Sequence, residues 1–215
     1  MLRKFSSLII NMLLIILIGS GCSEKDELSN QSDRFWYNDM IKAIELKDLD
    51  KADDNFLSLE TEHIRSPLLK TANIMMINAH IRSENYMLAG FYMDKYLSLF
   101  GTRDDREYIE YLRIKSKYLS LRRPLRDQKL LLDAIELVEN YEHDFSDSKY
   151  LPFVKTMGTN LILAKSHFNL ETARLYTRLD KNEASKYILS DKDMSWFKED
   201  EIEKPHVSFF RALFE

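Results

Sequence analysis

The chain has 215 residues, of which 45% are hydrophobic and 31% charged, so it can form one ordinary globular or repeat domain with little left for a second. Five glycines and four prolines argue against a loop-rich β fold, and no run of roughly 18 apolar residues is present to span a bilayer. The formal net charge of −4 at pH 7 argues against binding nucleic acid through a positive net field.

The N-terminus carries the pattern of an export signal. Arg3 and Lys4 give a positive start, an apolar run covers residues 8–18, and Gly-Ser-Gly at 19–21 leads directly to Cys22. Cys22 is the only cysteine, so no disulfide framework competes for it. The stretch resembles a bacterial lipoprotein signal, which implies that residues 1–21 are removed and Cys22 is acylated. The alternative is an ordinary cleaved signal with an incidental thiol.

The acylated Cys22 predicts attachment to a membrane surface without a spanning helix. Its acyl chains would contribute about 0.8 kcal/mol per buried methylene, enough for stable anchoring. Ser23 follows, not Asp, and by resemblance to lipoprotein sorting in enteric bacteria this favours outer-membrane lipid. Loss of Arg3 and Lys4 would leave 29 basic against 35 acidic residues, a net charge of −6. Residues 22–34 are polar and predict a flexible tether.

A small residue followed by two large ones recurs along the rest of the chain. In the predicted helix 49–59 the apolar residues fall three, four and three apart on one stripe. Its Ala52 has counterparts in Ala89, Ala134 and Ala173, spaced 37, 45 and 39 residues apart, a little longer than the roughly 34 of a tetratricopeptide unit. Small residues there let two helices cross closely. We expect an all-α fold, a right-handed solenoid of tetratricopeptide-like helical hairpins over residues 35–190.

Prolines and caps mark the predicted helix boundaries. The first hairpin joins residues 35–47 to 48–62, and the second begins with Ser66 as N-cap and Pro67 in the first helical position. Gly101 is predicted to end it as a left-handed cap. The other predicted helices cover residues 108–121, a stretch from about 126, then 149–168, 170–179 and 182–189, with Pro124, Pro152 and Pro205 at boundaries.

Polar and apolar residues left over from the core stripes predict a substrate-peptide groove. On the first helix of the second hairpin these are Asn73, Ile77 and His80, and on the first helix of the chain they are Tyr37 and Lys42. If first helices line a concave wall, these side chains could hold the terminal carboxylate and an aromatic side chain of a peptide. The alternative is that they are merely exposed.

A basic edge is predicted on the helix after Glu171. Arg174, Arg178 and Lys181 recur at plus four and plus three in a chain that is otherwise acidic, which favours a partner-binding surface. The alternative is local pairing of the two arginines with Glu171 or neighbouring carboxylates. The tail 191–215 becomes rich in aromatic residues and is expected either to cap the open end of the solenoid or to join a partner surface. Its large apolar residues include Trp196, Phe197, Val207, Phe209, Phe210 and Phe214.

The sequence contains none of the common catalytic or metal-binding motifs. Five scattered histidines form no H-E-x-x-H pair, and no second cysteine is present to build a zinc site. The glycines make no nucleophile elbow, Walker loop or dinucleotide-binding pattern. We therefore predict no catalytic residue, no metal and no cofactor.

An exported lipoprotein cysteine followed by these hairpins resembles the BamD family, lipoproteins of the machinery that assembles outer-membrane β-barrels. The resemblance runs from about Trp36 to Tyr187. Its particular points are Arg126-Asp127, Ser148-x-Tyr150, Leu163-Ala164, Glu171 to Tyr176 and Lys186-Tyr187. The segments EHIRSP at 62–67 and RDQ at 126–128 resemble those of family members found in Campylobacter-like bacteria.

The resemblance implies a scaffold and not a catalyst. Members bind the periplasmic POTRA region of the barrel subunit BamA through C-terminal repeats, and their N-terminal repeats are thought to receive the C-terminal strand of unfolded outer-membrane proteins. An arginine that pairs with an acidic POTRA residue falls at Arg178 or at position 179. The alternative is another tetratricopeptide lipoprotein that serves pilus assembly, secretion or envelope maintenance.

Overall fold

The computed structural model describes residues 30–121, 127–191 and 194, and the described part of the chain is all helical. Its helices are α2 (Asp33–Glu45), α3 (Leu49–Glu62), α4 (Leu68–Arg82), α5 (Tyr86–Phe100), α6 (Arg103–Ser120), α7 (Gln128–Asp144), α8 (Leu151–Arg178) and α9 (Asn182–Leu189). The predicted signal, most of the tether and most of the tail lie outside the described residues. Within them, none of the helices has the length and apolar character needed to cross a bilayer.

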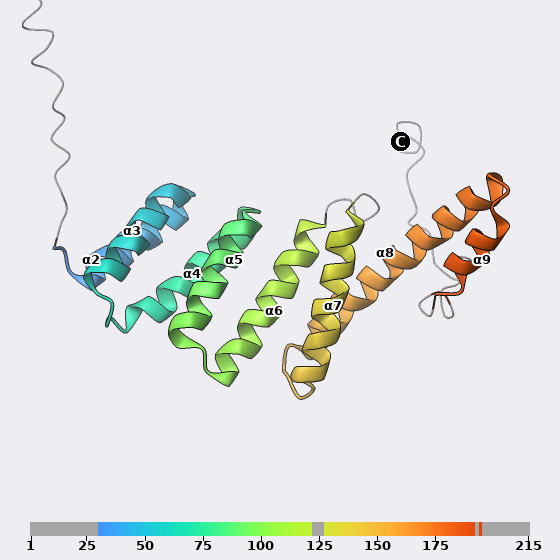
Figure 1. Cartoon of the computed structure of the whole chain (residues 1–215). Helices are drawn as coiled ribbons and strands as arrows, with labels where there is room; N and C mark the ends of the chain where they lie inside the picture. Colours follow the sequence, from blue (N-terminus) through green and yellow to red (C-terminus); the bar gives the residue numbers. More distant parts are fainter. Residues whose placement is uncertain (1–29, 122–126, 192–193, 195–215) are drawn as a thin grey trace, which may run out of the picture.

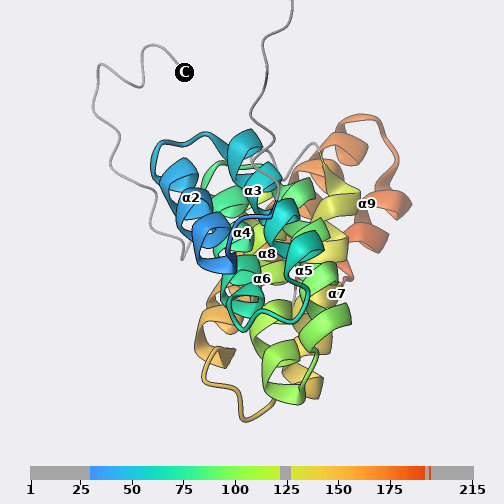
Figure 2. The same cartoon turned by 90° about the vertical axis from the view of Figure 1, so that its left-hand side faces the viewer.

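The helices pack in sequential order along an extended array. Figure 1 shows this order from α2 at one end to α9 at the other. Helix α2 packs on α3, α4 on α5, and α8 on both α7 and α9. In the view of Figure 2, α3, α5, α7 and α9 each lie to the right of the first helix of their own pair, which is α2, α4, α6 or α8. The first helices of the pairs thus form one layer, called the first-helix layer below, and the all-α prediction of tetratricopeptide-like hairpins is confirmed.

The repeated alanines lie where the prediction places them, inside the helix packing. Ala52, Ala89 and Ala134 have no exposed surface, and Ala173 is 2% exposed. A glycine serves the same purpose between α7 and α8. A Cβ atom added to Gly158 would lie 2.7 Å from Val138 Cγ1, so the two helices cross too closely for a side chain.

Two apolar cores lie along the array, and α6 contributes to both. The first core fills α2 to α5 and ends on α6 at Ile109 and Leu112. The second begins two residues later at Ile114 and continues through α7 and α8. Tyr111 packs against both cores. Helix α6 therefore joins the two halves of the molecule through opposite parts of its own surface.

Three helix pairs share one turn geometry that the sequence did not reveal. Lys47, Glu84 and Asp180 each have φ near +60° between the two helices of their pair. The next residue, Asp48, Asn85 or Lys181, donates its backbone N–H to a carbonyl five residues earlier. This is the Schellman motif, which satisfies the last carbonyls of a helix. The pair α8–α9 is thus closed by the same turn as α2–α3 and α4–α5.

Several predicted boundaries are wrong. Helix α6 begins at Arg103 and not at 108, and the N-cap of α4 is Pro67 and not Ser66. Gly101 has φ of −61° and is not a left-handed cap. The predicted helices 149–168 and 170–179 are a single helix, α8, of 28 residues. Asn169, at the predicted break, is neither glycine nor proline, so the backbone continues without interruption. One half of α8 serves the pair with α7 and the other half the pair with α9.

Candidate partner-binding surface

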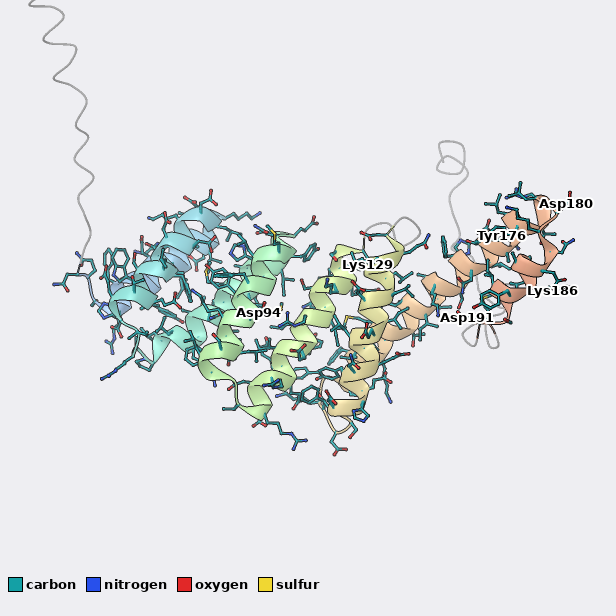
Figure 3. The ribbon with its side chains drawn as sticks, viewed as in Figure 1. Asp94, Lys129, Tyr176, Asp180, Lys186 and Asp191 are labelled. Carbon is teal, nitrogen blue, oxygen red and sulfur yellow. The ribbon has the colours of Figure 1, made fainter. Side chains whose placement is uncertain are left out.

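A groove runs between the C-terminal half of α8 and α9. It has a volume of about 400 Å³, and its lining combines two arginines with apolar side chains. The lining residues are Leu170, Glu171, Ala173, Arg174, Thr177, Arg178, Ser185 and Leu189. At the turn end the two helices are joined by a 2.9 Å hydrogen bond from Thr177 Oγ1 to Ser185 Oγ. Figure 3 shows the hairpin with Asp180 at its tip and Asp191 at the opposite end.

The structure separates the two arginines of the predicted basic edge by their partners. Arg174 pairs with Glu171 on the same helix, with 2.7 Å between Nη1 and Oε1, as the alternative interpretation predicts. Arg178, one turn later, is exposed and makes no ion pair with another described residue. Both line the groove. Of the two arginines in the groove, Arg178 is therefore the more available to an acidic partner.

Lys181 does not continue the basic edge along one helix. Helix α8 ends at Arg178, and Lys181 follows the Schellman turn as the N-cap of α9. Its ammonium lies 5.9 Å from the ring centroid of Tyr176. The prediction that Lys181 lies on the same helix as Arg178, three residues further along one face, is wrong. Asp180 has a positive φ, so the chain turns before it reaches Lys181.

The predicted substrate groove is wrong for three of its five residues. Asn73, Ile77 and His80 have no exposed surface, because they belong to the core between the first two hairpins. His80 Nε2 lies 2.9 Å from Asp53 Oδ1, which also accepts a 2.6 Å hydrogen bond from the Tyr92 hydroxyl. The Asn73 amide and His80 Nδ1 have no hydrogen-bond partner among the described residues. These side chains join hairpins and cannot line an open wall.

The other two residues of that prediction lie at the surface of α2. Lys42 is exposed. Tyr37 is half-buried, and its hydroxyl points to Met75 Sδ of α4 at 3.5 Å. Their place on the first-helix layer agrees with the expectation, and their role in peptide binding stays a prediction.

An aromatic cluster that the sequence reading missed lies on α6 and the start of α8. Tyr111 stacks on Tyr150 with ring centroids 4.8 Å apart, and Tyr108 and Phe153 complete the cluster. Phe153 is 60% exposed, while burial raises the pKa of the Tyr111 hydroxyl. Because the four rings come from segments about 40 residues apart, helical periodicity alone could not bring them together.

No group of histidine, cysteine, aspartate or glutamate side chains within residues 30–121 and 127–191 could hold a metal ion. The candidate functional features described above are the groove with its arginines, the aromatic cluster, and the surface of α2 that carries Tyr37 and Lys42.

Comparison with known proteins agrees with this description. Residues 29–185 match the family model YfiO, described as an outer membrane lipoprotein. The chain is also 30% identical over 217 residues to a Helicobacter pylori protein named outer membrane protein assembly factor BamD, and the match covers 100% of this chain and 99% of that protein. One description names a lipoprotein and the other an assembly factor, and the family is a non-enzymatic scaffold, as the sequence predicted. The chain belongs to the BamD (YfiO) family of outer-membrane lipoproteins of the β-barrel assembly machinery.

Proposed function

We propose that the mature protein is anchored through acylated Cys22 at the periplasmic face of the outer membrane. There it acts as a scaffold that binds the POTRA region of a BamA-like barrel subunit and segments of unfolded outer-membrane proteins. The full-length similarity to an assembly factor supports this proposal most directly. Such recognition uses an extended surface, which an array of hairpins offers, and needs no cofactor.

The α8–α9 groove is the proposed site for the barrel subunit. Arg178 is exposed there without an ion pair among the described residues, and Leu170 and Leu189 add apolar surface at the other end of the groove. A carboxylate of the partner, held by Arg178 in a desolvated interface, would make a charge-assisted pair. Arg174 and Lys181 border the same hairpin and add two further cations to it.

A charge reversal tests this site. Arg178→Glu should fold normally and lose co-purification with the barrel subunit, because reversing a partly buried interface charge costs roughly 2 to 5 kcal/mol. Lys186→Glu is the matched control, since Lys186 on α9 is 74% exposed and does not line the groove. An acid-to-base change in the partner should restore binding to Arg178→Glu. Normal co-purification of Arg174→Glu, Arg178→Glu and the double variant would place the interface elsewhere.

Peptide binding is proposed for the first-helix layer. Tyr37 and Lys42 lie on α2, and the aromatic cluster offers the exposed ring of Phe153 on α8 of the same layer, together with the half-buried ring of Tyr150 at the N-cap of α8. An extended segment with aromatic side chains could stack on such rings. Photo-crosslinkers at positions 37 and 153 should capture unfolded outer-membrane proteins. A crosslinker at Met87, 83% exposed on α5 of the other layer, should not. Equal capture at all three positions would contradict a defined binding layer.

A further inference from the structure

One end of the α8–α9 groove lies where the described chain leaves α9. Leu170 and Leu189 line that end, and Asp191 lies beyond it, where Lys165 Nζ of α8 approaches Asp191 Oδ2 at 3.2 Å. The backbone N–H of Met194 then bonds to the Asp191 carbonyl at 2.9 Å, which forms a tight turn. The described chain ends at Met194, three residues beyond Asp191.

The segment that follows is chemically matched to the groove. Residues 196–203 read Trp-Phe-Lys-Glu-Asp-Glu-Ile-Glu, two aromatic residues followed by an acidic run. The groove presents apolar side chains at the end near Asp191 and the two arginines, Arg174 and Arg178, toward the turn. A segment that entered the groove at Leu170 and continued toward Arg178 would need its aromatic residues first and its acidic residues second. The sequence has this order.

The distances allow this path. Trp196 is five residues beyond Asp191, a reach of up to about 17 Å in an extended chain. Lys165, which holds Asp191, is five residues before Leu170 on α8, or about 8 Å along the helix. Arg178 lies a further 12 Å or so along the same helix. The acidic run begins three residues after Trp196, so up to about 10 Å of extended chain separates the two.

We propose that residues 196–203 of this chain occupy its own α8–α9 groove, with Trp196 and Phe197 against Leu170 and Leu189 and the acidic run beside Arg174 and Arg178. The segment would then cover the last apolar seam of the array. This docking does not depend on the identity of any partner. If the proposed function also holds, an acidic partner must displace the segment before it reaches Arg178.

The fluorescence of Trp196 tests the proposal in the full mature chain. The sequence holds two tryptophans, so Trp36→Phe leaves Trp196 as the only one. Docking predicts a blue-shifted emission and protection from acrylamide. Arg174→Glu with Arg178→Glu should abolish that protection, and a further change of Glu199, Asp200 and Glu201 to lysine should restore it. Lys186→Glu, which alters an exposed lysine outside the groove, should leave the protection unchanged.

Three results would overturn the proposal. The first is a Trp196 as accessible to acrylamide as a free tryptophan derivative in a chain whose circular dichroism shows it folded. The second is protection that Lys186→Glu abolishes as fully as the arginine changes do. The third is protection that rises with protein concentration, since the groove would then take the tail of a second copy. Failure to co-purify a barrel subunit would bear on the proposed function alone.

Discussion

Gly158 of α8 lies so close to Val138 of α7 that a Cβ atom on the glycine would come within 2.7 Å of Val138 Cγ1. Gly158→Ala should therefore lower the free energy of unfolding by on the order of 1 kcal/mol, because the buried valine must move. Gly90 of α5 is the matched control. Nothing lies within 4 Å of an added Cβ there, so Gly90→Ala should stabilise by roughly 0.5 to 1 kcal/mol through helix propensity. Urea denaturation measures both, and a stabilising Gly158→Ala would contradict the close crossing.

The Schellman turns predict stabilising glycine substitutions. Lys47 and Glu84 have positive φ, a conformation that costs a residue with a Cβ about 1 kcal/mol or more. Lys47→Gly and Glu84→Gly should each raise the melting temperature, as measured by circular dichroism. Met87→Gly, at an exposed position inside α5, should lower it. The same sign for all three substitutions would mean that the turns are not left-handed.

Asp105 predicts how stability depends on acid. Burial raises the pKa of its carboxyl, but hydrogen bonds from Lys70, Thr102 and Tyr96 outweigh that effect and lower the pKa to about 2. The ordinary value is 3.8, so the unfolded chain takes up the proton first. The stabilisation is complete above that value and is lost as pH falls toward 2. Asp105→Asn should flatten this part of the curve of unfolding free energy against pH. Asp104→Asn, at the exposed neighbour, should preserve it.

The buried side chain of Asn73 is expected to lower the free energy of unfolding of the protein. Its amide is fully buried and has no hydrogen-bond partner among the described residues. Asn73→Leu keeps the branched shape and removes this desolvation cost, so the free energy of unfolding should rise by about 1 to 3 kcal/mol. Asn55→Leu is the comparison, because Asn55 donates to Asp39 Oδ2 at 3.2 Å and its loss should destabilise. Equal losses from both would show that Asn73 is satisfied in solution.

Cys22 predicts the attachment to the membrane. Cys22→Ala should leave the chain uncleaved or soluble in the periplasm, since the acyl chains supply the anchoring energy. Metabolic labelling with a palmitate analogue should mark the wild-type chain and not the variant. An unlabelled wild-type chain would remove the lipoprotein anchor, while the fold described above would stand.

The helical pairs could be predicted from the sequence because their stripes are regular. The repeat spacing predicts that Ala52, Ala89 and Ala134 are buried where helices cross, and all three are buried in the structure. The helix boundaries at turns were harder. Sequence reasoning expects glycine where φ is positive, whereas Lys47 and Glu84 take that conformation here. The backbone hydrogen bonds of the turn, not the side chain, decide the geometry.

The candidate site was predicted less completely, because its residues depend on contacts between distant segments. Asn73 and His80 are predicted at the surface because they fall beside the core stripe of their helix, yet Asp53 and Tyr92 from two other helices enclose His80. The periodicity of a sequence predicts which residues share one face of a helix, but it does not predict which other helices pack against that face. Arg178 could be predicted as a surface cation, while the groove beside it required the unexpected continuity of α8.

The sharing of α6 between the two cores has a consequence for the order in which the chain folds. As the polypeptide emerges N-terminus first, the first core is complete once Leu112 is available. Ile114 then waits for Leu131, Ala134 and the rest of α7 before it is buried. During that interval α6 presents an apolar strip to the solvent. A chaperone that accompanies the nascent protein should therefore bind α6, and its protection there should end when α7 arrives.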